Sequence, residues 1–423
     1  MRRTVLPGLT LAAAAVAAAA TISVPSRAAA DITIHDEDGW KVFTAGLIAS
    51  HYQLATGDGD PPAMGGVLVG GKLLPGGARD TRDDSITLSR FRSGFIGSQI
   101  GFGIGREISD TTHVDSFIAV SLNDVSSNRG QTLPKGVDFR EAWAALVTSG
   151  GTLKFGRMFS IFGSASAPVV LISHQYAVGN PCYLNDATIA CATVGAGPLY
   201  AGFNAEIRYI TPRFAGFEGQ FSIGEPQVGP SYQITPLPRF DAELNYDRQV
   251  SERTRIRLIG QAMTEEIQQV NGEDLQKARV WGAMGTGVLN LGGLAIGGGG
   301  WSGVGIGVRG VMEIIDAANP LAYDSAGTLR AFRGFFGNAS YTLFDKLTIA
   351  AGAGSAFVQS TSLDVAEDSS VNVLKQSMEY HATLAYRIDS VILTAEYMQW
   401  SNKWYEGEEQ NLVFAGAGAN FVW

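Results

Sequence analysis

The sequence is poor in cysteine, proline and charged residues. Its 423 residues include 2 Cys and 15 Pro, and 17% are charged, where about 25% is usual for globular proteins. Two cysteines are too few for a disulfide scaffold, and 53 Gly fall far short of the one residue in three that a triple helix requires. Because 45% of the residues are hydrophobic, the composition is not that of a disordered chain either.

A long hydrophobic run is also missing at the N-terminus. The Ala-rich apolar stretch 9–22 has about 14 residues, whereas a membrane-spanning helix needs roughly 20. It follows Arg2 and Arg3 and precedes three small residues, Ala28–Ala30, a pattern typical of a secretory signal peptide rather than of a membrane anchor. We therefore expect residues 1–30 to be a cleaved signal peptide and residues 31–423 to form the exported domain.

Acidic residues outnumber basic ones in the exported part. Of the 31 Lys and Arg, Arg2, Arg3 and Arg27 lie within residues 1–30, so 28 remain against 40 Asp and Glu, a formal charge of −12. An acidic surface argues against a nucleic-acid partner. It does not decide which small solutes the protein handles, because that depends on local charge.

The feature that recurs along the chain is a segment of alternating apolar and small or polar residues, which predicts a β-strand with two different faces. In 410–423, for example, Ala415, Ala417 and Phe421 share one face and Gly418 and Asn420 the other. Sixteen such strands are predicted, at 40–53, 85–106, 112–123, 137–148, 152–159, 201–211, 216–224, 238–247, 254–265, 278–289, 293–307, 328–342, 347–358, 374–387, 390–401 and 410–423.

The connections between these strands alternate between short turns and longer loops, the longest at about 54–84 and 160–200. An even number of strands with short turns on one side and long loops on the other is typical of an outer-membrane β-barrel. A soluble multidomain sandwich is the alternative, and it predicts interdomain linkers instead of this alternation. Aromatic residues near strand ends, Trp143 and Trp400 among them, fit two girdles at the membrane interfaces.

The uncharged run 280–308 contains 12 Gly and favours a close-packed β-hairpin over a membrane helix. Its small residues fit either a contact between subunits or a tightly packed wall.

Several segments resemble the general porins of Gram-negative bacteria. They are KVFTAGLIASHYQLATGDGD (41–60), FRSGFIGSQ (91–99), FREAWAAL (139–146), GTLKFGRMFSIFG (151–163) and NAEIRYITPRFAGFEGQFSIGE (204–225). The resemblance implies an all-β fold, a 16-stranded antiparallel transmembrane barrel with its third loop, about 160–200, folded into the lumen as a constriction. It also implies a homotrimer in outer-membrane lipid, and a basic wall that faces the third loop.

Four arginines are candidates for that basic wall. If Phe91 and Phe95 face lipid, Arg90 and Arg92 face inward. In the same way, Arg140 faces inward if Trp143, Ala145 and Val147 face outward. Arg92 and Arg140 also match the basic positions of the family, and Arg157 is a further candidate. For each of the four, a structural ion pair or a position at the membrane rim is the alternative.

The predicted constriction has little negative charge. Asp186 is the only acid between Phe159 and Tyr200, and Phe203 stands where many family members have another arginine. Rings of charge at a narrow point sort ions by sign, so we expect a weak preference for anions. Asp115 and Glu206, both predicted to face the lumen, could reverse it.

The same loop holds both cysteines, Cys182 and Cys191. In an exported protein a disulfide between them is the default expectation, and closing so short a loop contributes roughly 2–3 kcal/mol. Free thiols or a metal site are the alternatives.

Catalytic motifs are lacking. The sequence has neither Gly-x-Ser-x-Gly nor His-Glu-x-x-His, and the adjacent pair Ser173 and His174 has no spacing that indicates catalysis. We expect no enzyme activity, no cofactor and no metal. The sequence therefore predicts an outer-membrane pore for passive diffusion of small hydrophilic solutes and ions. A channel selective for a sugar, phosphate or organic acid, and a barrel enzyme or adhesin, are the alternatives.

Overall fold

The computed structural model describes residues 32–58, 78–80, 85–122, 137–178, 193–228, 232–269, 276–308, 321–324, 326–366, 373–405, 407 and 409–423. The expected signal peptide, Asp186, Cys182 and Cys191 lie outside these residues. Within the described part, no helix is both long enough and apolar enough to cross a membrane.

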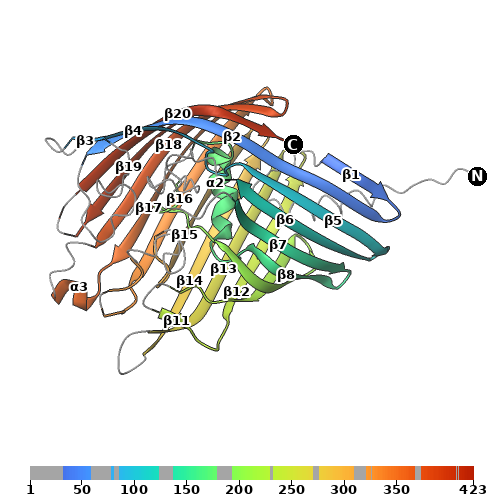
Figure 1. Cartoon of the computed structure of the whole chain (residues 1–423), viewed down its shortest axis with the longest axis horizontal. Coiled ribbons are helices and arrows are strands. Elements are labelled where there is room, and N and C mark those ends of the chain that lie inside the picture. Colours follow the sequence, from blue (N-terminus) through green and yellow to red (C-terminus); the bar gives the residue numbers. More distant parts are fainter. Residues whose placement is uncertain are drawn as a thin grey trace, which may run out of the picture.

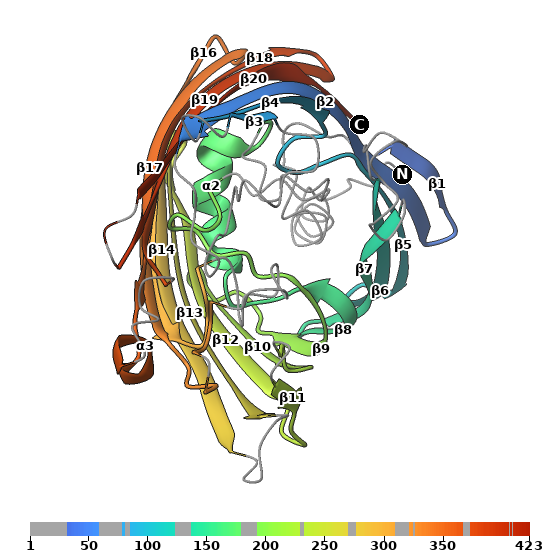
Figure 2. The same ribbon diagram turned by 60° about the vertical axis from the view of Figure 1, so that its left-hand side comes forward.

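The strands form a closed antiparallel barrel with 16 positions around its wall. Apart from β4 and β5, which both pair with β2, each strand of the wall pairs with the next along the chain. β20 pairs with β2, which closes the ring seen in Figures 1 and 2. The wall consists of β2 (Trp40–Asp58), β4 (Ser85–Arg92), β5 (Gln99–Ser109), β6 (Thr112–Leu122), β7 (Val137–Thr148), β8 (Gly151–Phe159), β9 (Phe203–Ile210), β10 (Phe217–Gly224), β12 (Arg239–Ser251), β13 (Thr254–Gln269), β14 (Lys277–Leu291), β15 (Leu294–Val304), β16 (Ala331–Leu343), β17 (Leu347–Gln359), β18 (Leu374–Ile388), β19 (Val391–Trp404) and β20 (Glu409–Val422).

β4 and β5 both pair with β2 and occupy one position of the wall. The remaining described elements are short. They are β1 (Ile32–Glu37), β3 (Ala78–Asp80), η1 (Ser164–Ser166), α2 (Ala167–His174), β11 (Tyr232–Ile234) and α3 (Ser362–Ala366). All sixteen predicted strand positions are therefore confirmed, whereas β1, β3 and β11 were not predicted.

The two faces of the wall differ in polarity, as the alternation predicts. Apolar side chains such as Phe91, Ile207 and Phe335 are exposed on one face, and polar side chains such as Gln261 and Asn338 are buried on the other. We call these the outer and the inner face. A closed sheet leaves no backbone edge unpaired, which lets an apolar outer face lie in lipid.

The single strand predicted at 85–106 is interrupted between β4 and β5. Gly94 and Gly97 there have φ values of +81° and +74°, a conformation that favours glycine. A Cβ on Gly94 would lie 2.7 Å from Cε1 of His51, so the backbone passes close to that ring. The interruption also turns Phe95 away from the predicted lipid side, because its ring centroid lies 6.3 Å from that of buried His174.

The predicted orientation of β7 is wrong for a related reason. The register between β6 and β7 shifts where Ala119 pairs with Glu141 and Val120 with Phe139, so Arg140 is an extra residue. A bulge of one residue changes which face the following side chains occupy. Trp143 and Ala145 are accordingly buried, not outward. Trp400 is also fully buried, which removes it, like Trp143, from the expected girdles.

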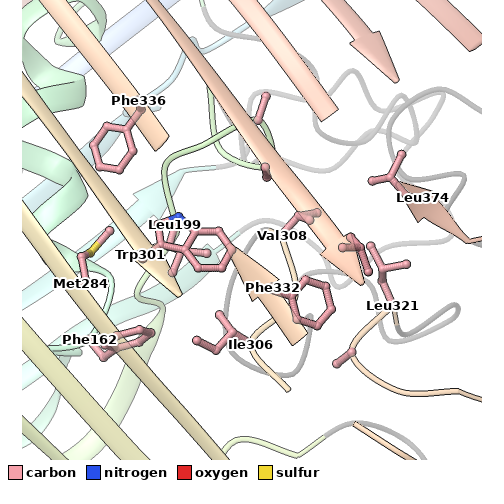
Figure 3. Close-up of a cluster of buried hydrophobic side chains, with 14 of the residues drawn as sticks. Phe162, Leu199, Met284, Trp301, Ile306, Val308, Leu321, Phe332, Phe336 and Leu374 are labelled. Atoms are coloured by element: carbon pink, nitrogen blue, oxygen red, sulfur yellow. The ribbon is translucent and has the colours of Figure 1, made fainter. Parts of the chain in front are cut away.

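The glycine-rich strands are a tightly packed wall. Beside β14, β15 and β16, the apolar residues Phe162, Leu199, Met284, Trp301, Ile306 and Phe336 form a buried cluster (Figure 3). A Cβ on Gly282 would lie 2.4 Å from the Phe162 ring. On the buried side of 280–308 the glycines therefore allow close packing, with the segment that follows β8 as the packing partner. On the exposed side, where a Cβ on Gly285 would meet nothing within 4 Å, the contact between subunits stays a prediction.

Candidate functional site

The inner face of β9 to β13 carries a continuous polar network. Arg208 forms an ion pair with Glu206, and Nη1 of Arg208 donates to Oε1 of Gln220 at 3.4 Å. Gln220 in turn donates to Glu243 at 3.1 Å, and Gln261 donates to the other oxygen of Glu243 at 2.6 Å. These groups pair with one another on a face from which lipid is excluded, which lowers the cost of burying their charges. Oε2 of Glu206 is the exception among them, because it has no hydrogen-bond partner in the described part of the chain.

A second ion pair continues this network along β12. Arg239 is fully buried, and its Nη2 lies 2.9 Å from Oδ1 of Asp241. Nη1 of Arg239 also donates to Oε1 of Gln227 at 2.8 Å. The pairs Glu206–Arg208 and Arg239–Asp241 are both separated by two residues. Since side chains two apart share a face of a strand, this spacing is a sequence signal that could have revealed them.

The segment after β8 is attached to the wall at its beginning. Oε1 of Gln261, on β13, accepts hydrogen bonds from the N–H groups of Gly163 at 3.0 Å and Ala165 at 3.3 Å. Nε2 of Gln261 also donates to Oγ of Ser164 at 2.8 Å. One glutamine side chain therefore fixes the start of η1 and α2.

The end of this segment is attached on the other side of the wall. The Phe95 N–H donates to the carbonyl of Ala177 at 3.1 Å, and Nδ2 of Asn420 donates to the carbonyl of Tyr176 at 3.2 Å. The Tyr176 hydroxyl accepts a hydrogen bond from Nη2 of Arg387 at 3.1 Å. Burial raises the pKa of Tyr176 above its ordinary value, so the phenol stays neutral near pH 7.

Glycines in β16 and β17 let the returning part of this segment approach the wall closely. Nε1 of Trp301 donates to the carbonyl of Gly197 at 2.5 Å. A Cβ on Gly354 would lie 2.1 Å from the carbonyl oxygen of Ala196, and one on Gly334 2.8 Å from that of Gly197. Side chains at these two positions would push residues 196 and 197 off the wall.

Between these attachments, α2 meets the inner face through a chain of titratable residues from three elements. Oγ of Ser173 lies 2.8 Å from Nδ1 of His174 and 2.9 Å from Nε2 of His381 on β18. Nδ1 of His381 lies 2.9 Å from Oε2 of Glu379, and Nε2 of His174 lies 2.9 Å from Oε1 of Glu396 on β19. All five residues are buried.

The sequence did not indicate these contacts between side chains, because Ser173 and His381 are 208 positions apart. The arrangement has the members of a hydrolytic triad, but Ser173 is buried with its hydroxyl between two imidazoles. Among the described residues, no group of three or more His, Cys, Asp or Glu is placed to hold a metal ion.

The predicted selectivity residues do not form one cluster. Positions 90 and 92 pair in register with Gln53 and His51, both buried on the inner face; nothing is described of the two arginine side chains.

The other two arginines lie differently. Arg140 lies in the β7 bulge, with Cζ 5.8 Å from the centroid of the Phe203 ring. Arg157 is exposed and shares its side of β8 with Leu153 and Phe155, on the outer face. The inward orientation predicted for Arg157 is therefore not what the structure has. Glu206 and Asp115 do lie on the inner side of their strands, as predicted.

Solved structures with the same fold are outer-membrane proteins. The chain is similar to the outer-membrane channel DcaP of Acinetobacter baumannii, at 13% identity and a TM-score of 0.66, over 92% of this chain and 99% of the other. It is also similar to an anion-selective porin from Comamonas acidovorans, at 12% identity and a TM-score of 0.59, over 91% of this chain and 100% of the other. A third similar structure is the trimer form of OmpT from Vibrio cholerae, at 13% identity and a TM-score of 0.51, over 91% of this chain and 100% of the other.

A search of curated proteins finds no match. The family model described as Gram-negative porin, in contrast, matches residues 9–355, well over half of the chain. The match spans the wall from β2 into β17 and includes the segment packed on the inner face. On this match and on its closed barrel of 16 strands, the chain belongs to the Gram-negative porin family of the outer membrane.

Proposed function

We propose that this porin is a pore through which small hydrophilic solutes and ions diffuse passively down their gradients. The observation that carries the proposal is the division of the closed wall into an apolar outer face and a polar, ion-paired inner face. Charged side chains in a membrane wall are stable where they face water or one another. An interior lined in this way is suited to a water-filled passage rather than to lipid or to a packed core.

We propose that the segment 160–200 narrows this passage. The support is its attachment to the inner face at Gln261, at His381 and at Asn420, three well-separated places on the wall. In Figure 2, α2 is drawn inside the ring of strands. A segment held at three places narrows a pore by a fixed amount and resists displacement by passing solutes.

We propose a weak preference for anions, carried by Arg90 and Arg92. Arg208 on β9 and Arg239 on β12 are each paired with a carboxylate two residues away, so these two arginines add little net field to the passage. By register, positions 90 and 92 belong to the inner side of β4. The anion-selective relative from Comamonas acidovorans is consistent with such a preference in this fold. Arg157 is left out of the set because it shares the exposed side of Leu153 and Phe155.

Three further proposals concern the mature protein. We propose that residues 1–30 are removed on export, that Cys182 and Cys191 form a disulfide within the 160–200 segment, and that three copies associate. The trimer form of the similar protein from Vibrio cholerae supports the last of these. A mass increase of two thiol adducts on alkylation after reduction, absent without reduction, would establish the disulfide. Labelling of the unreduced protein at both cysteines would refute it.

Liposome swelling tests the pore directly. Vesicles that contain the purified protein, diluted into isotonic sugars of graded size, should swell with the small sugars and more slowly as the sugar grows. Equal absence of swelling for every small sugar would refute passive diffusion. Swelling with one sugar but not with others of the same size would indicate a substrate-selective channel instead.

A further inference from the structure

Basic side chains gather at one edge of the outer face, on β14 and β16. Lys277 and Arg279 are the first and third residues of β14, and Arg333 is the third residue of β16. All three side chains are exposed. Each arginine is followed two residues later by an exposed aromatic residue, Trp281 on β14 and Phe335 on β16. Side chains two residues apart share a face of a strand, so these arginines belong to the apolar outer face.

This edge lies at the extracellular end of the barrel. β14 and β15 are joined at their other end by the short turn 292–293, and short turns face the periplasm in barrels of this kind. Exposed aromatic side chains mark the boundary between the hydrocarbon core and the lipid headgroups. Two residues of a strand span about 7 Å. Each arginine therefore lies one such step outside its aromatic neighbour, at the level of the headgroups of the outer leaflet.

The protein leaves part of this positive charge unbalanced. On the outer face of β13 to β17, Glu266 is the one carboxylate at this edge among the residues that the structure describes. Its Oε1 lies 2.7 Å from Nζ of Lys277, and its Oε2 lies 4.0 Å from Nη2 of Arg279. Cζ of Arg333 lies 5.3 Å from the centroid of the Phe357 ring, which contributes no charge. Three cations against one carboxylate leave a surplus of two positive charges.

The two arginines flank β15 and can contact one headgroup between them. In register, Ser302 of β15 pairs with Ala283 of β14 on one side and with Arg333 on the other. Arg279 lies four residues from Ala283, so its Cα is about 16 Å from that of Arg333 at the usual strand spacing. The strand between them presents the short, exposed side chain of Ser302. Long side chains from both strands can therefore converge above β15.

A second copy of the chain is a poorer match for this edge than a lipid. A contact between copies would need carboxylates opposite the arginines, because a buried unpaired charge is costly. Two carboxylates of this edge, Glu266 and Glu409, already lie 2.7 and 2.5 Å from lysines. Lipid phosphates supply the negative charge that is needed, and guanidinium groups bind phosphate in a bidentate manner.

We propose that Arg279 and Arg333 form a binding site for the phosphate groups of an outer-leaflet lipid. The acyl chains of that lipid lie against the aromatic residues one strand step deeper. Guanidinium groups stay charged throughout the physiological pH range, so the site holds the phosphates directly, without a bridging metal ion. The site goes beyond the proposed pore function and does not depend on it.

Titration with lipid A, a phosphorylated glycolipid, tests the site in detergent-solubilised protein by native mass spectrometry. The double variant Arg279→Gln with Arg333→Gln should raise the dissociation constant about 30-fold, because two basic contacts with the phosphates are lost. Wild-type protein should bind lipid A without its phosphates equally weakly. Binding of intact lipid A should weaken as the ionic strength rises and should persist in EDTA.

Arg106 provides the matched control. It is an exposed arginine at the periplasmic end of the barrel, with Cζ 4.8 Å from the centroid of the Trp40 ring. Its neighbours in register, Trp40 and Val114, are uncharged, so it is a single arginine rather than one of a pair. Arg106→Gln should therefore bind lipid A like the wild type.

Equal dissociation constants for the wild type and the double variant, or equal binding of intact and dephosphorylated lipid A, would overturn the proposal. Efficient cross-linking of Ser302→Cys between two copies in outer membranes would also overturn it, because this edge would then be a contact between subunits. Protein that binds lipid A as predicted but never conducts in bilayers would support the lipid site and refute the pore.

Discussion

The ion pair between Arg330 and Asp364 links the chain just before β16 to helix α3, and removing it gives a quantitative prediction. Both side chains are buried, with Nε–Oδ2 and Nη2–Oδ1 distances of 2.8 and 2.7 Å. Nη1 of Arg330 also donates to the carbonyls of Leu321 and Tyr323. Asp364→Ala would leave the guanidinium buried without this carboxylate, which costs about 3–5 kcal/mol.

This energy should appear as faster local hydrogen exchange. The Arg330 N–H donates to the carbonyl of Ala322 at 2.8 Å, and the Asp324 N–H to that of Thr328 at 3.0 Å. At about 1.4 kcal/mol for each factor of ten, both amides should exchange about 10²–10⁴ times faster in Asp364→Ala. The effect should be smaller in Asp364→Asn, which keeps an acceptor oxygen. Exchange within threefold of the wild type in Asp364→Ala would refute the assignment of this pair as the link.

The pH dependence of the same link has a definite sign. Burial disfavours the Asp364 carboxylate, but hydrogen bonds from Arg330 and Thr361 and the charge of Arg330 outweigh it and lower the pKa of Asp364 below 3.8. When the pKa of a carboxyl is lower in the folded than in the unfolded state, its full stabilisation is present at a pH above the unfolded-state pKa. This stabilisation is lost as the pH falls through the folded-state pKa. The two amides should therefore keep their protection at pH 5 and lose it only below pH 4, whereas loss already at pH 6 would contradict this cause.

Two further predictions concern the wall. Gly354→Ala should displace the segment packed against it and destabilise the barrel by about 1–3 kcal/mol. In gels, the folded band should therefore change to the unfolded band at a lower temperature than in the wild type. Gly260→Ala, whose Cβ would meet nothing within 4 Å, is the control and should migrate like the wild type. The double variant Arg90→Gln with Arg92→Gln should shift the reversal potential in a salt gradient toward cations, and Arg157→Gln, on the outer face, should not; equal shifts in both would refute the assignment.

The strand pattern could be predicted from the sequence because a wall between lipid and a polar interior imposes a period of two on nearly every segment. The interruption at Gly94 and the bulge at Arg140 could not be placed in this way. Each follows from one or a few residues that step out of the pairing, and one extra residue reverses the face of all that follow it. This is why Trp143 was predicted to face lipid and is buried instead.

The candidate site was less accessible to sequence reasoning for a different reason. Ser173 and His381 meet only because α2 packs against β14 to β18, and nothing local in either segment indicates this contact. The ion pairs at Glu206–Arg208 and Arg239–Asp241, by contrast, have the spacing of two that places both partners on one face. Strand parity combined with charge would have identified these pairs, but not the contacts of α2.

Single-channel recording in planar bilayers tests the central claim most directly. Purified protein that migrates as a folded barrel in unheated gels should insert with discrete current steps at neutral pH, and the current should rise linearly with the concentration of salt. Such steps are the result that an open, polar passage through the wall predicts. Folded, inserted protein that never conducts would contradict the account of this chain as a diffusion pore.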